Sequence, residues 1–288
     1  MIMKKTILIT GSSTGFGKLT ALTLSRAGYQ VIATMRETEG KNKDVAHELN
    51  ALDDIDVLEL DVTSDNSVEQ AMSHIKAKYS NIDVLINNAG VAGGGIMEAY
   101  SMENIKSMYE INVFGVFRMY QAVLPFMRAA KKGLIINLSS FVGIFSSPYL
   151  VPYNSTKFAL EAISEGMQGE LRQFNIENVS IISGAFPTEM NTGVKSGITG
   201  DKVSIIDAYG EAARKDMETF GNGIGEQMGK NKPQDMAKAI KSIIEMPEGS
   251  RPTRFPLDAI AEGTDIALIS AIKPFKKQWA EKYGVNLD

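Results

Sequence analysis

The chain of 288 residues contains no cysteine and only two histidines, His47 and His74. The lack of thiols excludes disulfides, a cysteine nucleophile and thiolate-bound metal. Two isolated histidines are too few for a clustered metal site or a catalytic site that needs several histidines, so we expect no metal. Positive charge is not in excess either, because 30 basic and 34 acidic residues give a net charge of −4. Nucleic-acid binders usually carry a basic stripe, so we expect no nucleic-acid partner.

Long apolar runs are also missing. The N-terminal charges are followed by a short apolar run that ends at Thr10, which is too short for a secretory signal. The uncharged stretch 134–156 is interrupted by Asn, Ser and Pro, and is typical of a buried strand followed by a loop. In the tail, residues 273–279 predict a solvated helix end in which Trp279 is buried. We therefore expect a cytoplasmic protein with no membrane contact.

Hydrophobic residues make up 44% of the chain, enough for a sizeable core. Short runs that are apolar on both faces alternate with segments of helical period, which is typical of parallel strands covered by helices on both faces. The sequence therefore predicts an α/β protein with a doubly wound parallel sheet, a Rossmann fold, in a single domain over 1–288. The strands are expected at 5–10, 30–34, 55–60, 83–87, 133–138 and 178–182, and helices include 18–27, 64–79, 105–127 and 158–174.

The composition and the hydrophobic periodicity of the chain change after residue 183. Residues 184–229 are rich in Gly, Thr and Met with weak periodicity, and we interpret 189–230 as a substrate flap over the site. Residues 233–246 predict a regular helix. The prolines at 251–257 indicate a short edge strand, which opens a C-terminal extension over 251–288 with a helical tail at 258–282.

A glycine cluster joins the first strand to the first helix. Gly11, Gly15 and Gly17 stand where the backbone must turn sharply and approach a pyrophosphate, while the helix N-terminus offers free N–H groups. After the second strand, an acidic residue would hold the 2′-hydroxyl of NAD. Arg36 stands there instead and can bind a 2′-phosphate, with a hydroxyl contact from Ser12. This pattern favours NADP(H), with NAD(H) as the alternative.

A tyrosine and a lysine, Tyr153 and Lys157, stand four residues apart and share one face of a helix. The phenol of tyrosine has an ordinary pKa near ~10, which is high for an acid–base group at neutral pH. A nearby ammonium favours the phenolate, so we expect Lys157 to lower the pKa of Tyr153. Ser140 follows the strand at 133–138 and is expected at the same edge of the sheet as the glycine turn.

Taken together, these motifs resemble the short-chain dehydrogenase/reductase family in order and spacing over residues 10–188. The matching segments are TGxxxGxG at 10–17, Asp61-Val62, NNAG at 87–90, NVFG at 112–115, Ser139-Ser140 and YxxxK at 153–157. The resemblance implies a catalytic set of Asn112, Ser140, Tyr153 and Lys157. Tyr153 would exchange a proton with the substrate oxygen, Ser140 would hydrogen-bond that oxygen, Lys157 would hold the nicotinamide ribose, and Asn112 would hold a relay water.

The same resemblance implies a nicotinamide dinucleotide site, in which Asp61 and Val62 contact the adenine and Thr188 contacts the nicotinamide carboxamide. The residues expected to bind the cofactor are Gly11, Ser12, Gly15, Phe16, Gly17, Arg36, Asp61, Val62, Asn88, Ala89, Gly90, Tyr153, Lys157 and Thr188. The chain departs from the family at Ser183-Gly184, where Pro-Gly is usual. It also lacks the family's short C-terminal strand with a glycine pair, which leaves both a homodimer and a homotetramer open.

Apolar residues are expected at the substrate mouth, with Gly93, Gly94 and Gly95 leaving room beside them. These apolar residues are Phe141, Val142, Ile144, Phe145, Tyr149, Leu150, Phe186 and Met190. We therefore predict an NADP(H)-dependent carbonyl reductase that converts an apolar ketone or aldehyde to an alcohol. The alternatives are an NAD-dependent alcohol or hydroxysteroid-type dehydrogenase and a non-catalytic dinucleotide-binding sensor.

Overall fold

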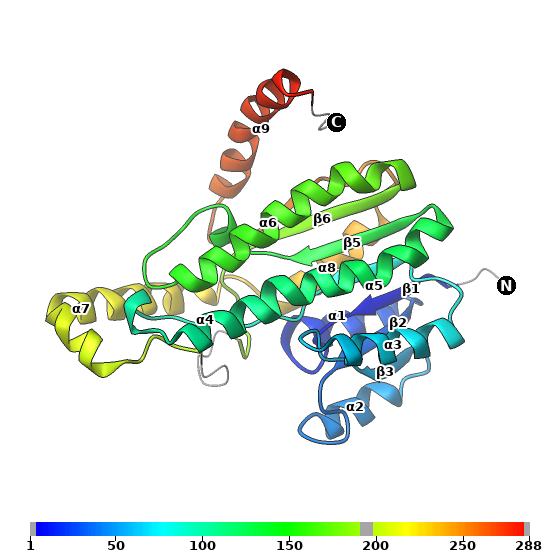
Figure 1. Cartoon of the computed structure of the whole chain (residues 1–288), viewed down its shortest axis with the longest axis horizontal. Coiled ribbons are helices and arrows are strands. Elements are labelled where there is room, and N and C mark those ends of the chain that lie inside the picture. The colour runs from blue at the N-terminus through cyan, green and yellow to red at the C-terminus, as the bar shows by residue number, and fades with distance from the viewer. Residues whose placement is uncertain (1–3, 191–197, 285–288) are drawn as a thin grey trace.

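Seven strands form one fully parallel sheet in the computed structural model, which describes residues 4–190 and 198–284 (Figure 1). The strand order is β3-β2-β1-β4-β5-β6-β7. The strands are β1 (Thr6–Ile9), β2 (Gln30–Met35), β3 (Ile55–Glu59), β4 (Val84–Asn87), β5 (Gly133–Leu138), β6 (Ile176–Ser183) and β7 (Arg254–Leu257). The predicted doubly wound fold and each of its predicted strands are confirmed.

The sheet separates two hydrophobic cores, because successive side chains of a strand point to opposite faces. Ile7 and Ile9 of β1 pack on one face, and Leu8 packs on the other. The first face is covered by α1 (Gly15–Arg26), α2 (Lys43–Asn50) and α8 (Pro233–Glu245). The second is covered by α3 (Asp65–Lys78), α5 (Gly115–Ala130) and α6 (Val151–Leu171). Burial on both faces explains why β1, β2 and β4 are mostly apolar.

The predicted helix over 105–127 is divided in three. α4 (Met102–Tyr109) is followed by η2 (Glu110–Phe114), one turn of π-helix, and then by α5. The short 3₁₀ turns are η1 (Met97–Ala99), η3 (Phe141–Gly143) and η4 (Arg172–Phe174). A π-helical turn inside a helix is uncommon and is often found at functional sites, and this one contains Asn112.

The region expected to be a substrate flap, in which short helices were allowed, contains one long helix, α7 (Val203–Met228). Its backbone is broken at Gly210, where φ is +80°. In Figure 1, α7 and α4 lie beyond the carboxyl ends of the central strands. Residues 191–197 of the expected flap lie outside the described part of the chain, and the role of 189–230 as a substrate flap stays a prediction.

The C-terminal part follows the prediction more closely. β7 pairs with β6 at the sheet edge, where Pro256 is tolerated. α9 (Thr264–Lys282) forms the tail and projects from the body of the molecule (Figure 1). Trp279 is 60% exposed, so the predicted burial of this side chain is wrong: the helix end extends beyond the surface that would cover it. Among the described helices, none is both long and apolar enough to cross a bilayer.

Candidate active site

The turn between β1 and α1 is a cradle of closely packed backbone. A Cβ added at Gly11, where φ is +69°, would lie 2.9 Å from Cα of Ala89. At Gly17, a Cβ would lie 2.3 Å from the carbonyl oxygen of Gly11. The N-cap residue of α1, Thr14, makes no side-chain cap, so the first N–H groups keep the donor capacity that an anion requires. This cradle fits a pyrophosphate, as the glycine spacing predicts.

Side chains from β1 and β4 hold the cradle in place. Asn88 Nδ2 donates to the carbonyl oxygens of Thr10 and Gly11 at 2.7 and 2.8 Å. Thr10 Oγ1 accepts from the backbone N–H groups of Asn88 and Ala89. Ser12 is fully buried, and its hydroxyl donates to Ile9 O at 3.2 Å. Here Ser12 stabilises the turn, and its direct contact with a cofactor stays a prediction.

The loop after β6 lies against the same turn. The ring of Phe186 packs edge-to-face on Phe16 with centroids 5.1 Å apart, and a Cβ added at Gly15 would lie 3.8 Å from Cβ of Thr188. Thr188 thus lies beside the glycine turn, and its contact with the nicotinamide stays a prediction. Phe186 is only 1% exposed, so its expected place at the substrate mouth is wrong: the ring belongs to the core beneath the turn.

Two residues from separate strands meet where the adenine end of a dinucleotide is expected. Arg36 follows β2, is 57% exposed, and has its Nη1 3.8 Å from Asp61 Oδ2. The other oxygen of Asp61 accepts from the N–H and the hydroxyl of Thr63. Val62 is buried, and a Cβ at Gly115 would lie 2.8 Å from its Cγ2. The structure therefore brings Arg36, Asp61 and Val62 together.

Asn112, in the π-helical turn, is buried between the β4 loop and α6. Its Oδ1 accepts from Val91 N at 2.9 Å, and its Nδ2 donates to Val91 O at 2.8 Å and to Thr156 Oγ1 at 3.0 Å. The segment that contains Gly90 packs on it as well, since a Cβ at Gly90 would lie 3.3 Å from Asn112 Oδ1. Asn112 thus joins the NNAG loop to the helix that carries Tyr153.

Ser140, Tyr153 and Lys157 come together at the carboxyl end of β5. Helix α6 begins at Val151, so Tyr153 and Lys157 share a helix face, and Lys157 Nζ lies 5.7 Å from the centre of the tyrosine ring. Lys157 Nζ also donates to Leu138 O at 2.8 Å. Ser140 hydrogen-bonds Tyr153. The predicted serine, tyrosine and lysine are therefore adjacent, beside the edge that carries the glycine turn.

Burial controls the ionisation of this set. It raises the pKa of Tyr153 to about 12, and the hydrogen bond with Ser140 opposes that rise. Burial lowers the pKa of Lys157 to about 8, and the negative charge of Glu161 opposes that fall. The expected lowering of the Tyr153 pKa is thus wrong for this structure, because desolvation of the phenolate outweighs the opposing effects. A phenol with a raised pKa keeps its proton at neutral pH and can donate it.

Aromatic side chains gather beside this set. Phe141 and Phe145 stack with centroids 5.5 Å apart. Tyr149, which adopts a left-handed backbone with φ +61°, lies against Phe220 of α7 with centroids 6.1 Å apart. A non-glycine residue in this conformation is uncommon and is often found near functional sites. The weak periodicity of 184–229 gave no signal for Phe220, although its ring lies against Tyr149, one of the expected mouth residues.

The glycines at 93–95 do not leave open room. A Cβ at Gly93 would lie 1.9 Å from Ile198 O, and Gly95 forms a parallel bridge with Gly200. Gly200 N also donates to Gly94 O at 3.2 Å. The glycine run therefore admits a neighbouring backbone, and the expectation of space for a substrate there is corrected.

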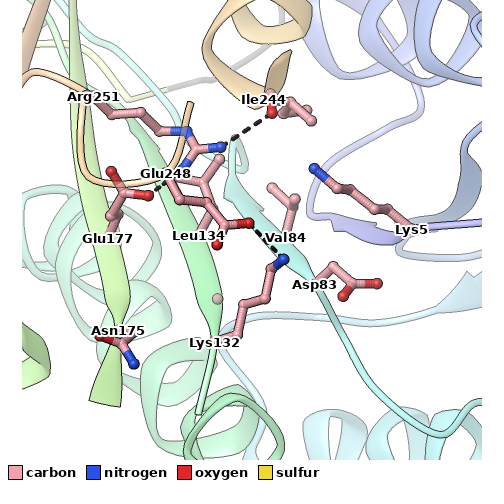
Figure 2. Close-up of a pocket in the computed structure, with 11 residues that line it drawn as sticks. Lys5, Asp83, Val84, Lys132, Leu134, Asn175, Glu177, Ile244, Glu248 and Arg251 are labelled. Atoms are coloured by element: carbon pink, nitrogen blue, oxygen red, sulfur yellow. Dashed lines mark hydrogen bonds and ion pairs between the residues drawn. The ribbon is translucent and has the colours of Figure 1, made fainter. Parts of the chain in front are cut away.

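A pocket lies at the opposite edge of the sheet, where the strands begin (Figure 2). Its charged side chains pair with one another: Lys132 with Glu248, and Arg251 with Glu177. Arg251 also donates to the carbonyl oxygen of Ile244 at the end of α8. These ion pairs connect loops at the amino ends of the strands, whereas the predicted site residues lie at the carboxyl ends. Within residues 4–190 and 198–284, no three acidic or histidine side chains are grouped to hold a metal.

The chain is similar to known proteins over most of its length. The family model described as short chain dehydrogenase matches residues 5–198. The chain is 39% identical over 209 residues to 3-ketodihydrosphingosine reductase of Bacteroides thetaiotaomicron, covering 70% of this chain and 72% of the relative. It is 35% identical over 253 residues to retinol dehydrogenase 8 of Bos taurus, covering 83% and 78%.

Solved structures agree with the fold. A short-chain dehydrogenase from Streptomyces avermitilis superposes with a TM-score of 0.79 at 28% identity, and the match covers 98% of both chains. ElxO with NADP bound superposes with a TM-score of 0.70 at 25% identity, covering 89% of this chain and 98% of that one.

Proposed function

The chain belongs to the short-chain dehydrogenase family, and on this premise we propose that it is an NADP(H)-dependent reductase of apolar ketones or aldehydes. It is an oxidoreductase that acts on CH–OH and C=O groups with a nicotinamide dinucleotide. The observation that carries the proposal is the contact of Ser140, Tyr153 and Lys157 at the edge that holds the glycine turn.

The residues of the site divide the work of a carbonyl reduction. A bound nicotinamide dinucleotide supplies the hydride, and the cradle of Gly11 and Gly17 would hold its pyrophosphate. Tyr153, which carries its proton at neutral pH, donates it to the carbonyl oxygen. Ser140 hydrogen-bonds the same oxygen and orients it. Lys157, charged below its pKa of about 8, stabilises the negative charge that develops on the tyrosine oxygen.

An apolar substrate is supported by the side chains around this set. The stacked Phe141 and Phe145 and the Tyr149–Phe220 pair offer ring surfaces without charge. Ligand sites commonly combine such apolar walls with a few placed polar groups. The relatives named for 3-ketodihydrosphingosine and for retinol act on molecules that are mostly hydrocarbon, which supports the same class of substrate.

Replacing Tyr153 tests the chemistry. We expect Tyr153→Phe to lower turnover of an aryl alkyl ketone with NADPH by about 10²–10⁴-fold, because the proton donor is removed. Binding of NADPH, measured by calorimetry, should stay close to wild type. Tyr209→Phe, on the exposed part of α7, is the matched control and should keep full turnover. Turnover near wild type in Tyr153→Phe would exclude this mechanism and favour a non-catalytic dinucleotide sensor.

Cofactor choice is tested by titrating the protein with NADPH and with NADH. The exposed Arg36 follows β2 at the position where an acidic residue would favour NAD(H). We expect NADPH to bind about tenfold more tightly, which corresponds to about 1.4 kcal/mol, and Arg36→Gln to abolish the difference. Equal or tighter binding of NADH to the wild type would instead support the NAD-dependent dehydrogenase.

A further inference from the structure

One helix turn beyond Lys157, α6 carries a buried carboxylate that the mechanism above does not use. Glu161 is 4% exposed and lies four residues after Lys157, so the two side chains share a helix face. Helix η3 packs directly on this stretch. A Cβ added at Gly143 would lie 2.9 Å from Lys157 O and 3.1 Å from Glu161 Cγ. Both side chains are therefore buried beneath η3, with Lys157 8% and Glu161 4% exposed.

Two strands hold the carboxylate in place. The hydroxyl of Ser180, on β6, donates to Glu161 Oε1, and Arg254 Nε, on β7, donates to Oε2 at 2.6 Å. Arg254 also donates to Glu165 at 2.9 Å, and Glu165 pairs with Lys276 of α9. Both oxygens of Glu161 thus have partners, and the position of its charge is set by the sheet.

We infer that Glu161 is a positioning residue of the active site, whose buried charge keeps Lys157 protonated and so sets the upper pH limit of the reaction. The inference rests on the proposed function, because it assigns Lys157 the support of Tyr153. The ion pair that Glu161 makes is with Arg254, and a buried ion pair contributes little net stability compared with apolar side chains. Stability alone therefore does not account for a carboxylate that is fixed one helix turn from Lys157.

The surroundings of Lys157 give the direction of this effect. On its own helix, Lys157 has neutral Tyr153 on one side and Glu161 on the other. From β5, the carbonyl oxygen of Leu138 accepts its hydrogen bond. From η2, the uncharged amide of Asn112 donates to Thr156, the residue before Lys157. Behind Glu161, β6 presents Ser180 and β7 presents Arg254. Burial lowers the Lys157 pKa and Glu161 raises it. Removing the negative charge should therefore release the lysine proton at a lower pH.

The ionisation of Lys157 can be measured without turnover. In the cofactor-free protein labelled with carbon-13 lysine, the Cε signal of Lys157 is assigned by its loss in Lys157→Arg and titrated with pH. We expect Glu161→Gln to lower the midpoint by about one pH unit, as the removal of a close opposite charge does. Glu161→Asp should keep a midpoint near wild type. Glu165→Gln is the matched control, because it disturbs the same arginine but is two turns from Lys157, and it should leave the midpoint in place.

Activity gives the second reading. The alkaline limb of kcat/KM for NADPH-dependent ketone reduction should move with the midpoint in Glu161→Gln and stay in Glu165→Gln. If Glu161 is merely structural, Glu161→Gln lowers stability without moving the Lys157 midpoint, which would overturn the inference. Should Glu161→Gln fail to fold, Glu161→Met removes the same negative charge while Arg254 keeps its pairing with Glu165, and an unmoved midpoint there has the same meaning.

The two proposals fail in different ways. If Tyr153→Phe keeps its turnover, the proposed function is wrong, whatever Lys157 does. If Tyr153→Phe is inactive and the Lys157 midpoint does not respond to Glu161→Gln, only the role of Glu161 is wrong.

Discussion

The proposed cofactor side of the site is formed by closely packed backbone, whereas its proposed substrate side is formed by side chains. On the cofactor side, backbone meets backbone so closely that a Cβ at Gly17 would lie 2.3 Å from a carbonyl oxygen. On the substrate side, α7 has no buried residue and reaches the site through side chains, such as Phe220 against Tyr149 at 6.1 Å. In the first region an added Cβ at Gly11 or Gly17 would overlap neighbouring backbone, whereas the second can exchange side chains without disturbing the fold.

This difference matches the extent of the family model, which covers residues 5–198 and ends before α7. A pyrophosphate presents the same shape to every such enzyme, so a rigid backbone cradle suits it. Substrates differ, and segments outside the packed sheet change with little cost in stability. Three substitutions test whether the division holds.

The largest effect is expected at Gly17. In Gly17→Ala, the new methyl group meets the Gly11 carbonyl and Asn88 Nδ2, and overpacking of this kind costs about 1–3 kcal/mol. If the turn moves to relieve the contact, NADPH affinity should fall about 10- to 100-fold. Calorimetry measures the affinity, and thermal unfolding shows whether the fold survives. Unchanged affinity in a folded variant would mean that this cradle does not hold the cofactor.

A smaller effect is expected at Phe220. Phe220→Ala removes one ring of the Tyr149–Phe220 pair, and aromatic contacts of this type contribute about 0.5–1.5 kcal/mol. We expect KM for an aryl alkyl ketone to rise about 2- to 10-fold, while NADPH affinity stays unchanged. Steady-state kinetics at saturating NADPH provide the measurement, and pyruvate serves as the small charged comparison. A larger loss for pyruvate than for the aryl ketone would contradict an apolar mouth.

The smallest effect is expected one residue further along α7. A Cβ at Gly221 would meet no atom within 4 Å, so Gly221→Ala should add about 0.5–1 kcal/mol of stability through the helix propensity of alanine. Chemical denaturation gives the free energy of unfolding, and activity should not change. Since this is the same substitution as at Gly17, a loss of cofactor binding here would break the contrast between the two sides.

Much of the fold could be predicted because its signals are local. The strands from β1 to β6 contain short apolar runs, and that pattern depends only on neighbours along the chain. The pair of Tyr153 and Lys157 likewise needs only one helix to share a face. The division of the helix over 105–127 could not be predicted, because its periodicity continues through the π-helical turn. The break is evident only in the structure, where Asn112 hydrogen-bonds Val91 and Thr156.

The sequence by itself determined the parallel sheet, the glycine turn and the serine, tyrosine and lysine that meet beside it, because strand pattern, turn geometry and helix period are properties of short segments. Only the tertiary structure decided which residues became core and which became site. It buried Phe186 against Phe16, filled the space at Gly93 with the backbone of Ile198, and left Trp279 exposed. It also raised the Tyr153 pKa, lowered that of Lys157 and placed Glu161 against Arg254, since desolvation and charge pairing depend on partners distant in the chain.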